Sequence, residues 1–324
     1  MLRRILSCFA VAAWLLGAMP AIRAAAYPTR PITLVVAFTP GGASDVLARI
    51  LGRKLEQILG QPIVIDNRPG AGGNVAAEAV AHSAPDGYTL FTGNNAILAT
   101  NAALYKKINF DPVADFAPIG LIGSQANILV VNPALPVRSM DELIALAKAN
   151  PGKLNFASSG HGLAAHLAGE LFKAEAKIDL VHVPYKGAAP ALQDVIAGHV
   201  QMMFATASSV VSHIRDGKVR ALGVTTLKRT AVMPEIPTID ELGLKGFDAT
   251  SWHGLVAPAH TPKDIIVALH GALAASLDDP DVKKSLGDLG VDIMGGSPED
   301  FSAYIKSEIP KWTAIVKASG ARLD

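Results

Sequence analysis

Short apolar runs alternate with stretches of helical periodicity along most of the chain. The runs are typical of buried strands, and they fall at Ile32–Phe38, Ile63–Asp66, Thr89–Thr92, Leu154–Ala157, Leu180–Pro184, Val200–Phe204 and Val219–Thr225. Between them, apolar residues recur at helical spacing, as in Leu47–Leu59, which Gly60 and Pro62 terminate. Strands separated by helices of this length predict an α/β fold with parallel, doubly wound sheets.

Three later helix starts are indicated by their capping residues. Ser139–Glu142 has the pattern of a capping box. Thr261 and Ser297 are each followed by a proline, so each is expected to cap a helix whose first residue is that proline.

Two apolar segments that contain glycine are expected to cross between two lobes. They are Ile119–Val131 and Trp252–Pro258. With two crossings, residues 27–125 plus 253–324 form one lobe and residues 126–252 form the other. Two α/β lobes joined by a double hinge enclose a cleft, and ligands of such sheets bind beyond the carboxyl ends of the strands.

The first 26 residues have the pattern of a secretory signal. Two arginines precede an apolar run from Ile5 to Ala18, and small residues end at Ala26, near which we expect cleavage. An uncleaved membrane anchor is the alternative, although the run is short for a bilayer. The mature chain would then be a soluble protein of the periplasm without cysteine, since Cys8 leaves with the signal.

Composition narrows the classes of partner. The chain has 29 basic and 28 acidic residues, and losing the three arginines of residues 1–26 leaves 26 against 28, a net charge of −2. No basic stripe remains to bind nucleic acid. The 324 residues are 50% hydrophobic and 18% charged, which is typical of a globular protein of about two domains.

Two glycine-bearing loops each join a strand to a helix. In Phe38–Asp45 (FTPGGASD) a strand ends and a helix begins within a few residues, and Asn155–His166 (NFASSGHGLAAH) repeats the arrangement. The first N–H groups of a helix have no intrahelical partner and carry partial positive charge, so such starts bind carboxylate or phosphate without a basic side chain. The alternative is a tight turn with no ligand. Asp45 would repel an anion, so it is expected to cap the loop or to accept from a ligand hydroxyl, amine or water.

Other polar residues could complete the rim of such a cleft. Thr92, Gly93, Asn94 and Asn95 follow a strand, where amide side chains suit a ligand carboxyl or hydroxyl. Lys186 precedes a helix, where an ordinary exposed lysine is equally reasonable. His161 could reach a ligand, whereas His166 is more simply an ordinary hydrogen-bonded histidine. We expect no metal and no cofactor, because His166 and Glu170 alone make a poor metal site. Neither Ser158 nor Ser159 lies in a G-x-S-x-G motif, because Ala157 precedes them.

Four stretches together resemble the Bug family, the extracytoplasmic solute receptors of bacterial tripartite tricarboxylate transporters. They are YPTRPITLVVAFTPGGASDVLAR, IVIDNRPGAGGNVAAEAVAHSAPDGYTLFTG, LNFASSGHGLAAHLAGELF and VPYKGAAPALQDVIAGHVQMMF. The resemblance implies a two-lobed type II periplasmic-binding-protein fold that captures small carboxylates through backbone amides and ordered waters. It implies ligand-binding residues at Phe38, Thr39, Pro40, Gly41, Gly42, Ala43, Asp45, Thr92, Asn94, Ser158, Ser159, Gly160, His161, Gly162 and Ala205.

The favoured function is therefore a non-catalytic, monomeric receptor that delivers a small carboxylate to the membrane subunits of a tripartite tricarboxylate transporter. One alternative is an exported hydrolase or isomerase on the same scaffold that uses Ser159 with a histidine. Another is a sensor that presents its ligand to a signalling partner.

Overall fold

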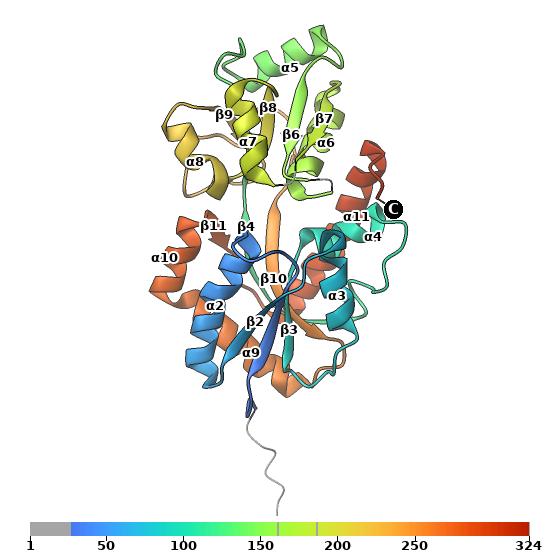
Figure 1. Cartoon of the computed structure of the whole chain (residues 1–324), viewed down its shortest axis with the longest axis vertical. Coiled ribbons are helices and arrows are strands. Elements are labelled where there is room, and N and C mark those ends of the chain that lie inside the picture. Colours follow the sequence, from blue (N-terminus) through green and yellow to red (C-terminus); the bar gives the residue numbers. More distant parts are fainter. Residues whose placement is uncertain (1–26, 161, 186, 324) are drawn as a thin grey trace, which may run out of the picture.

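The computed structural model describes residues 27–160, 162–185 and 187–323. Two β-sheets, each covered by helices, lie one above the other along the long axis of the molecule (Figure 1). We refer to the sheet nearer the N-terminus and its helices as the first lobe, and to the other sheet and its helices as the second lobe. The two-lobed α/β architecture predicted from the sequence is confirmed.

The first lobe contains a six-stranded sheet in the order β11-β4-β10-β3-β1-β2. Its strands in chain order are β1 Ile32–Val36, β2 Ile63–Asn67, β3 Thr89–Asn94, β4 Phe116–Gln125, β10 Ser251–Pro258 and β11 Val291–Ile293. The second lobe contains a five-stranded sheet in the order β7-β6-β8-β5-β9. Its strands are β5 Asn127–Val131, β6 Asn155–Ser158, β7 Val181–Pro184, β8 Met202–Thr206 and β9 Arg220–Val224.

The predicted parallel pairing holds for only part of each sheet. β1 pairs in parallel with β2 and β3, but β10 runs antiparallel to both β3 and β4, and β5 runs antiparallel to β8 and β9. β5 and β10 are the strands that enter a lobe from the other one. They therefore start at the junction of the lobes and run away from it, whereas β1, β3, β6 and β8 run towards it (Figure 1).

Helices cover both faces of each sheet. In the first lobe they are α2 Ala43–Leu59, α3 Asn74–Ala81, α4 Asn101–Leu104, α9 Lys263–Asp278, α10 Pro280–Asp288 and α11 Pro298–Ser319, with a 3-10 turn at Ala71–Gly73 and a π-helical segment at Ala96–Thr100. In the second lobe they are α5 Met140–Ala149, α6 Ala164–Ala176, α7 Ala188–Ala197 and α8 Ala207–Arg215. No helix within the described residues is both long enough and apolar enough to cross a bilayer.

Of the three predicted helix starts, one is confirmed in full. Ser297 forms a reciprocal capping box with Asp300 at α11, with Pro298 as the first helical residue. Ser139 caps α5 as expected. The third prediction is wrong by one residue, because α9 begins at Lys263 and Pro262 itself occupies the capping position.

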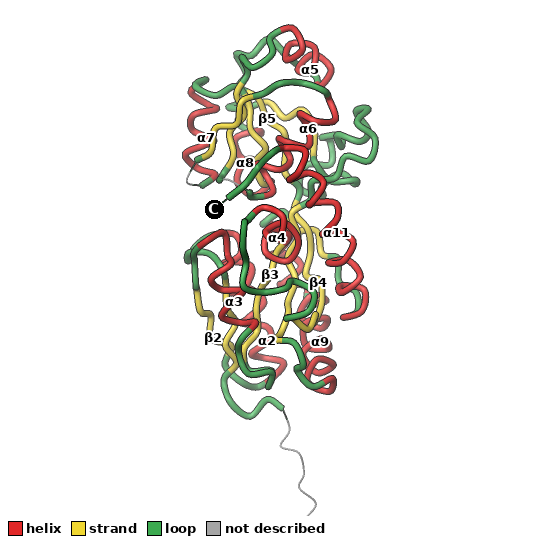
Figure 2. The backbone as a smooth tube through the Cα atoms, turned by 90° about the vertical axis from the view of Figure 1, so that its right-hand side faces the viewer, coloured by secondary structure: helices red, strands yellow, loops and turns green. Residues whose placement is uncertain are grey.

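Helix α11 extends alongside both lobes. It contacts β4 in the first lobe and α6 in the second, and Figure 2 shows it running along one side of the molecule past the junction. Gly254 in β10 permits a close approach, because a Cβ there would overlap the ring of Phe301 in α11.

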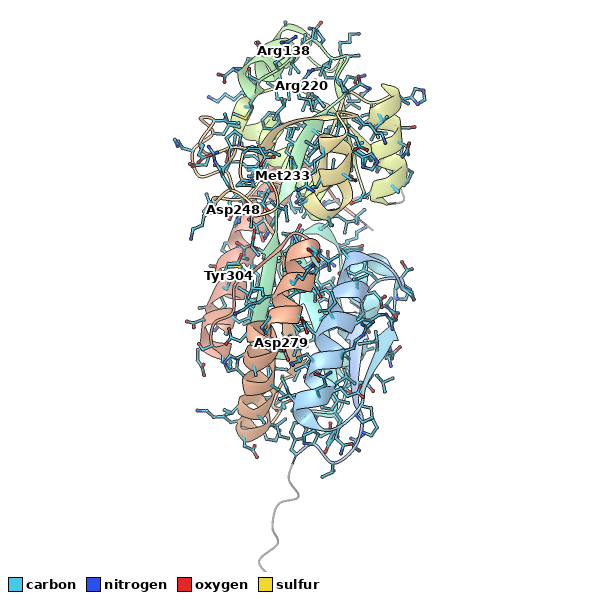
Figure 3. All side chains as sticks on the ribbon, turned by 90° about the vertical axis from the view of Figure 1, so that its left-hand side faces the viewer. Arg138, Arg220, Met233, Asp248, Asp279 and Tyr304 are labelled. Atoms are coloured by element: carbon cyan, nitrogen blue, oxygen red, sulfur yellow. The ribbon has the colours of Figure 1, made fainter. Side chains whose placement is uncertain are left out.

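A buried carboxylate fastens α11 to the start of β10. Glu308 accepts hydrogen bonds from the indole nitrogens of Trp252 (2.9 Å) and Trp312 (2.8 Å), and all three residues are at most 4% exposed. Lys311 bonds to the other oxygen of Glu308 at 3.1 Å and to Asp248 at 2.7 Å. Asp248 lies at the junction of the lobes, near Tyr304 of α11 (Figure 3). The cluster therefore links the C-terminal helix to the connection between the sheets.

Replacing Glu308 with leucine is expected to lower the free energy of unfolding by about 2–5 kcal/mol, because two buried indole N–H groups and one lysine lose their acceptor. Glu308→Gln should cost less, since the amide oxygen still accepts one bond. Chemical denaturation followed by tryptophan fluorescence measures both, with the exposed Lys306→Ala in the same helix as the control. Equal stabilities of Glu308→Leu and the wild type would contradict this role.

Candidate binding cleft

A cavity of about 370 Å³ lies between the two lobes. Its size is within the range of small-molecule sites. The lining residues come from both lobes and from the crossing strands: Phe38, Thr39, Gly42, Ala43, Ser44, Asn94, Asn95, Ala96, Gln125, Asn127, Ser159, Leu163, Ala164, Ala165, Gly187, Ala188, Thr206, Ser251 and His253. None of these residues is lysine, arginine, aspartate or glutamate.

The first lobe contributes the start of α2 to the cavity. After β1 the chain turns through Gly41, whose φ of +82° is available mainly to glycine, and Gly42 is the capping residue. No side chain caps this helix, so its first N–H groups keep their hydrogen-bonding capacity. Ala43 and Ser44, in the first turn, line the cavity.

The second lobe contributes two helix starts of the same kind. α6 begins after Leu163 and α7 begins after Gly187, and neither capping residue makes a side-chain cap. Ala164 and Ala188, the first residues of these helices, line the cavity. α8 also begins here, but its first N–H is already bonded to the carbonyl of Ala126 at 3.1 Å. Three uncapped helix starts therefore meet at one cavity.

Asp45 supports the loop before α2 from beneath. Its carboxylate accepts from the N–H of Gly41 (2.8 Å), from Nε of Arg49 (2.9 Å) and from Nδ2 of Asn67 (2.9 Å). Asn67 also donates to the carbonyl of Phe38 at 2.9 Å, which fixes both ends of the loop. The hydrogen bond from Arg49 is the main cause that lowers the pKa of Asp45 to about 2. Asp45 thus caps the loop, which is one of the two roles expected for it from the sequence.

A serine and two histidines lie behind the loop of the second lobe. The hydroxyl of Ser158 is 2.7 Å from Nε2 of His182, whose ring stacks on that of His166 with centroids 3.9 Å apart. His166 accepts the N–H of Gly162 at 3.0 Å. The hydrolase alternative names Ser159, but the serine that contacts a histidine in this cluster is the buried Ser158. The comparisons below give that alternative no support.

The predicted ligand-binding residues separate into two groups. Those that line the cavity are Phe38, Thr39, Gly42, Ala43, Asn94 and Ser159. Those that do not line it are Pro40, Gly41, Asp45, Thr92, Ser158, Gly160, Gly162 and Ala205. Thr92 donates to the carbonyl of Val35 inside the sheet, and Ala205 is buried in β8. His161 and the candidate Lys186 lie outside the described residues.

The floor of the cavity was missed by the sequence analysis. It is formed where the crossing strands begin and end, by Gln125, Asn127, Ser251 and His253. Burial lowers the pKa of His253 to about 4, so its imidazole is neutral at neutral pH. The available signal was the presence of polar side chains inside otherwise apolar crossing segments. Among the described residues, no three His, Cys, Asp or Glu side chains group as a metal site would require.

The fold and the cavity define a two-lobed solute-binding protein. Residues 47–321 match the family described as tripartite tricarboxylate transporter family receptor, TctC, and the chain belongs to this family. The resemblance to Bug receptors is therefore confirmed.

Relatives and solved structures agree with this assignment. Protein BugT of Bordetella pertussis is 38% identical, over 95% of this chain and 94% of BugT. The structure of Rpa4515 of R. palustris with adipate is 39% identical, with a TM-score of 0.82, covering 92% of this chain and 100% of that one. The structure of MatC from Rhodopseudomonas palustris with bound malate is 35% identical, with a TM-score of 0.78, covering 90% and 100%.

Replacing Asp45 with asparagine is expected to remove the part of the free energy of unfolding that depends on the ionised Asp45 carboxylate. The folded pKa of Asp45 lies below its unfolded value of about 3.9, so the stabilisation is present above about pH 4 and is lost as the pH falls towards about 2. Urea denaturation across this window should show a shallower loss of stability in the variant. The exposed Asp264→Asn serves as control, and an unchanged pH dependence in Asp45→Asn would refute the assignment.

We expect the free energy of unfolding to depend on the protonation of His253 as well, at a higher pH. Its folded pKa of about 4 lies below the unfolded value of about 6.5, so the unfolded chain binds the extra proton as the pH falls. Up to about 3 kcal/mol of stability, present above about pH 6.5, should be lost as the pH approaches 4. His253→Gln should flatten this part of the profile, whereas the exposed His82→Gln should not. A wild-type profile that is flat between these values would contradict a neutral buried imidazole.

Proposed function

We propose that this protein binds a small carboxylate in the cleft and delivers it to the membrane subunits of a tripartite tricarboxylate transporter. The observation that carries the proposal is the meeting of three uncapped helix starts at one cavity. They offer N–H donors and the positive ends of helix dipoles to an anion, without any basic side chain among the described lining residues.

The contacts divide into those that touch the ligand and those that shape the loops. We infer that the first-turn amides of α2, α6 and α7 bind the carboxylate, with Thr39, Asn94 and Ser159 beside it. Gly41, Asp45, Ser158, Gly160 and Gly162 act through loop geometry. The adipate and malate bound by two related receptors support a ligand of this class.

The protein acts without catalysis. It works as a monomer in the periplasm, after cleavage near Ala26. Residues 27–125 plus 253–324 form one moving body and residues 126–252 the other, so the lobes close on the ligand. Closure strengthens the amide–carboxylate hydrogen bonds by excluding water, and the ligand stabilises the closed state by its differential affinity.

Removing one helix-start donor at a time tests the proposal. Ala43 and Ala164 are the first residues of α2 and α6, and the residue before each has extended backbone, ψ 165° and 160°. Proline is tolerated at this position and after an extended residue, but it has no N–H. Ala43→Pro and Ala164→Pro should each weaken carboxylate binding by about 10- to 100-fold, the cost of one charge-assisted hydrogen bond.

Titration calorimetry with a panel of small mono- and dicarboxylates, adipate and malate included, measures this effect. Lys263→Pro makes the same change at the start of α9, which does not line the cavity, and should leave binding unchanged. The proposal fails if no carboxylate of the panel binds the wild type. It also fails if the folded variants Ala43→Pro and Ala164→Pro both bind carboxylates as tightly as the wild type does.

A further inference from the structure

Three buried polar atoms on the cavity wall have no hydrogen-bond partner among the described residues. They are Nδ2 of Asn95, Oδ1 of Asn127 and Nδ1 of His253. These residues are 3%, 0% and 6% exposed, and all three line the cavity. An unpaired buried polar atom is costly, so a concentration of three at one place points to a group that enters from the cavity.

Asn127 and His253 belong to the floor, and Asn95 lies beside it. His253 in β10 pairs in register with Asn94, the residue before Asn95. Asn127, at the start of β5, reaches Ser251 at the start of β10 with its amide nitrogen, at 3.4 Å. The site thus lies where both crossing strands begin.

The bonds of Asn127 fix which of its atoms is unpaired. Its nitrogen Nδ2 faces the backbone carbonyl of Ala249 at 3.4 Å, and a carbonyl can only accept. The unpaired atom is therefore the oxygen, which needs a donor. Nδ2 of Asn95 needs an acceptor, and Nδ1 of His253 takes either role according to its tautomer.

A carboxylate does not meet these requirements. It accepts hydrogen bonds but donates none, so it would face the Asn127 oxygen with like polarity. The described lining residues supply no cation to offset its desolvation, and the His253 imidazole is neutral at neutral pH. A hydroxyl or a carboxamide both donates and accepts without carrying a charge.

We propose that Asn95, Asn127 and His253 form a subsite for an uncharged hydroxyl or carboxamide substituent of the ligand. This inference rests on the proposed function, in which the helix starts hold the ligand's carboxylate. The substrate class narrows to carboxylates that bear a second, neutral hydrogen-bonding group.

Matched sets of acids test the subsite. For chains of four to six carbons, each set contains the monocarboxylate, its hydroxy acids with the hydroxyl at each carbon, the monoamide of the dicarboxylate, and the dicarboxylate itself. Titration calorimetry at neutral pH gives their Kd values. At the chain length that fits, a hydroxy or amide acid should bind at least about ten-fold more tightly than both the monocarboxylate and the dicarboxylate, the gain from satisfying buried polar groups.

Substitutions in the floor test whether its residues cause the preference for hydroxy or amide acids. Asn127→Leu and His253→Leu should each bring the Kd of the preferred acid to within about three-fold of the monocarboxylate's Kd, with the monocarboxylate itself little changed. Thr100→Val is the matched control, because Thr100 Oγ1 is equally buried and unpaired among the described residues but does not line the cavity. A variant that merely loosens the cleft would weaken all acids alike.

Several outcomes overturn the subsite. Tightest binding by the dicarboxylate would mean that a charged group occupies the floor. Equal binding of the monocarboxylate and its hydroxy and amide analogues would mean that water alone fills it. A preference that survives in both leucine variants would place the selecting contact elsewhere. If no acid of any class binds, the proposed function fails as well, which separates that failure from the others.

Discussion

Backbone N–H groups at the start of a helix must find an acceptor, and in this protein that constraint organises the cleft. α2, α6 and α7 all begin at the cavity, and no side chain caps any of them. Elsewhere a side chain caps three helices, with Ser139 at α5, Asp279 at α10 and Ser297 at α11, whereas α3 and α9 have no such cap. What distinguishes α2, α6 and α7 is that their uncapped starts line one cavity. The N–H groups at these three starts are the donors that we propose for an anion.

Holding those donors in place requires support from outside the cavity. The carboxylate of Asp45 stabilises the loop before α2 by accepting hydrogen bonds from Gly41, Arg49 and Asn67. A carboxylate that is fully engaged in this way is satisfied within the protein, although it sits in the first turn of a helix that faces a ligand site. In the second lobe the N–H of Gly187 bonds to the carbonyl of Ser159 at 3.1 Å, which ties two adjacent loops together. The loops are therefore preorganised, and preorganised donors lose little entropy when a ligand binds.

Sequence patterns predicted the features that depend on residues close together in the chain, such as strands, helix ends and turns. The seven apolar runs predicted as strands agree with β1, β2, β3, β6, β7, β8 and β9 to within about two residues, and α2 ends at Gly60 as expected. The loop Phe38–Ala43 was recognisable because Gly41 and Gly42 stand between an apolar run and a stretch of helical periodicity. The direction of β5 and β10 could not be read in this way, since it follows from the path of the chain between lobes. For the same reason Asn127 and His253 were missed: their neighbours in sequence are apolar, and only the crossing brings them to the cavity floor.

The antiparallel entry of β5 and β10 has a consequence for how such a receptor can diversify. The residues that open these strands, Asn127 and Ser251, belong both to the cavity wall and to the connection between the two sheets. A substitution there changes a residue of the cavity lining and a residue of this connection at the same time. In the loop before α2, by contrast, a substitution changes the cavity lining without touching the strands that join the lobes.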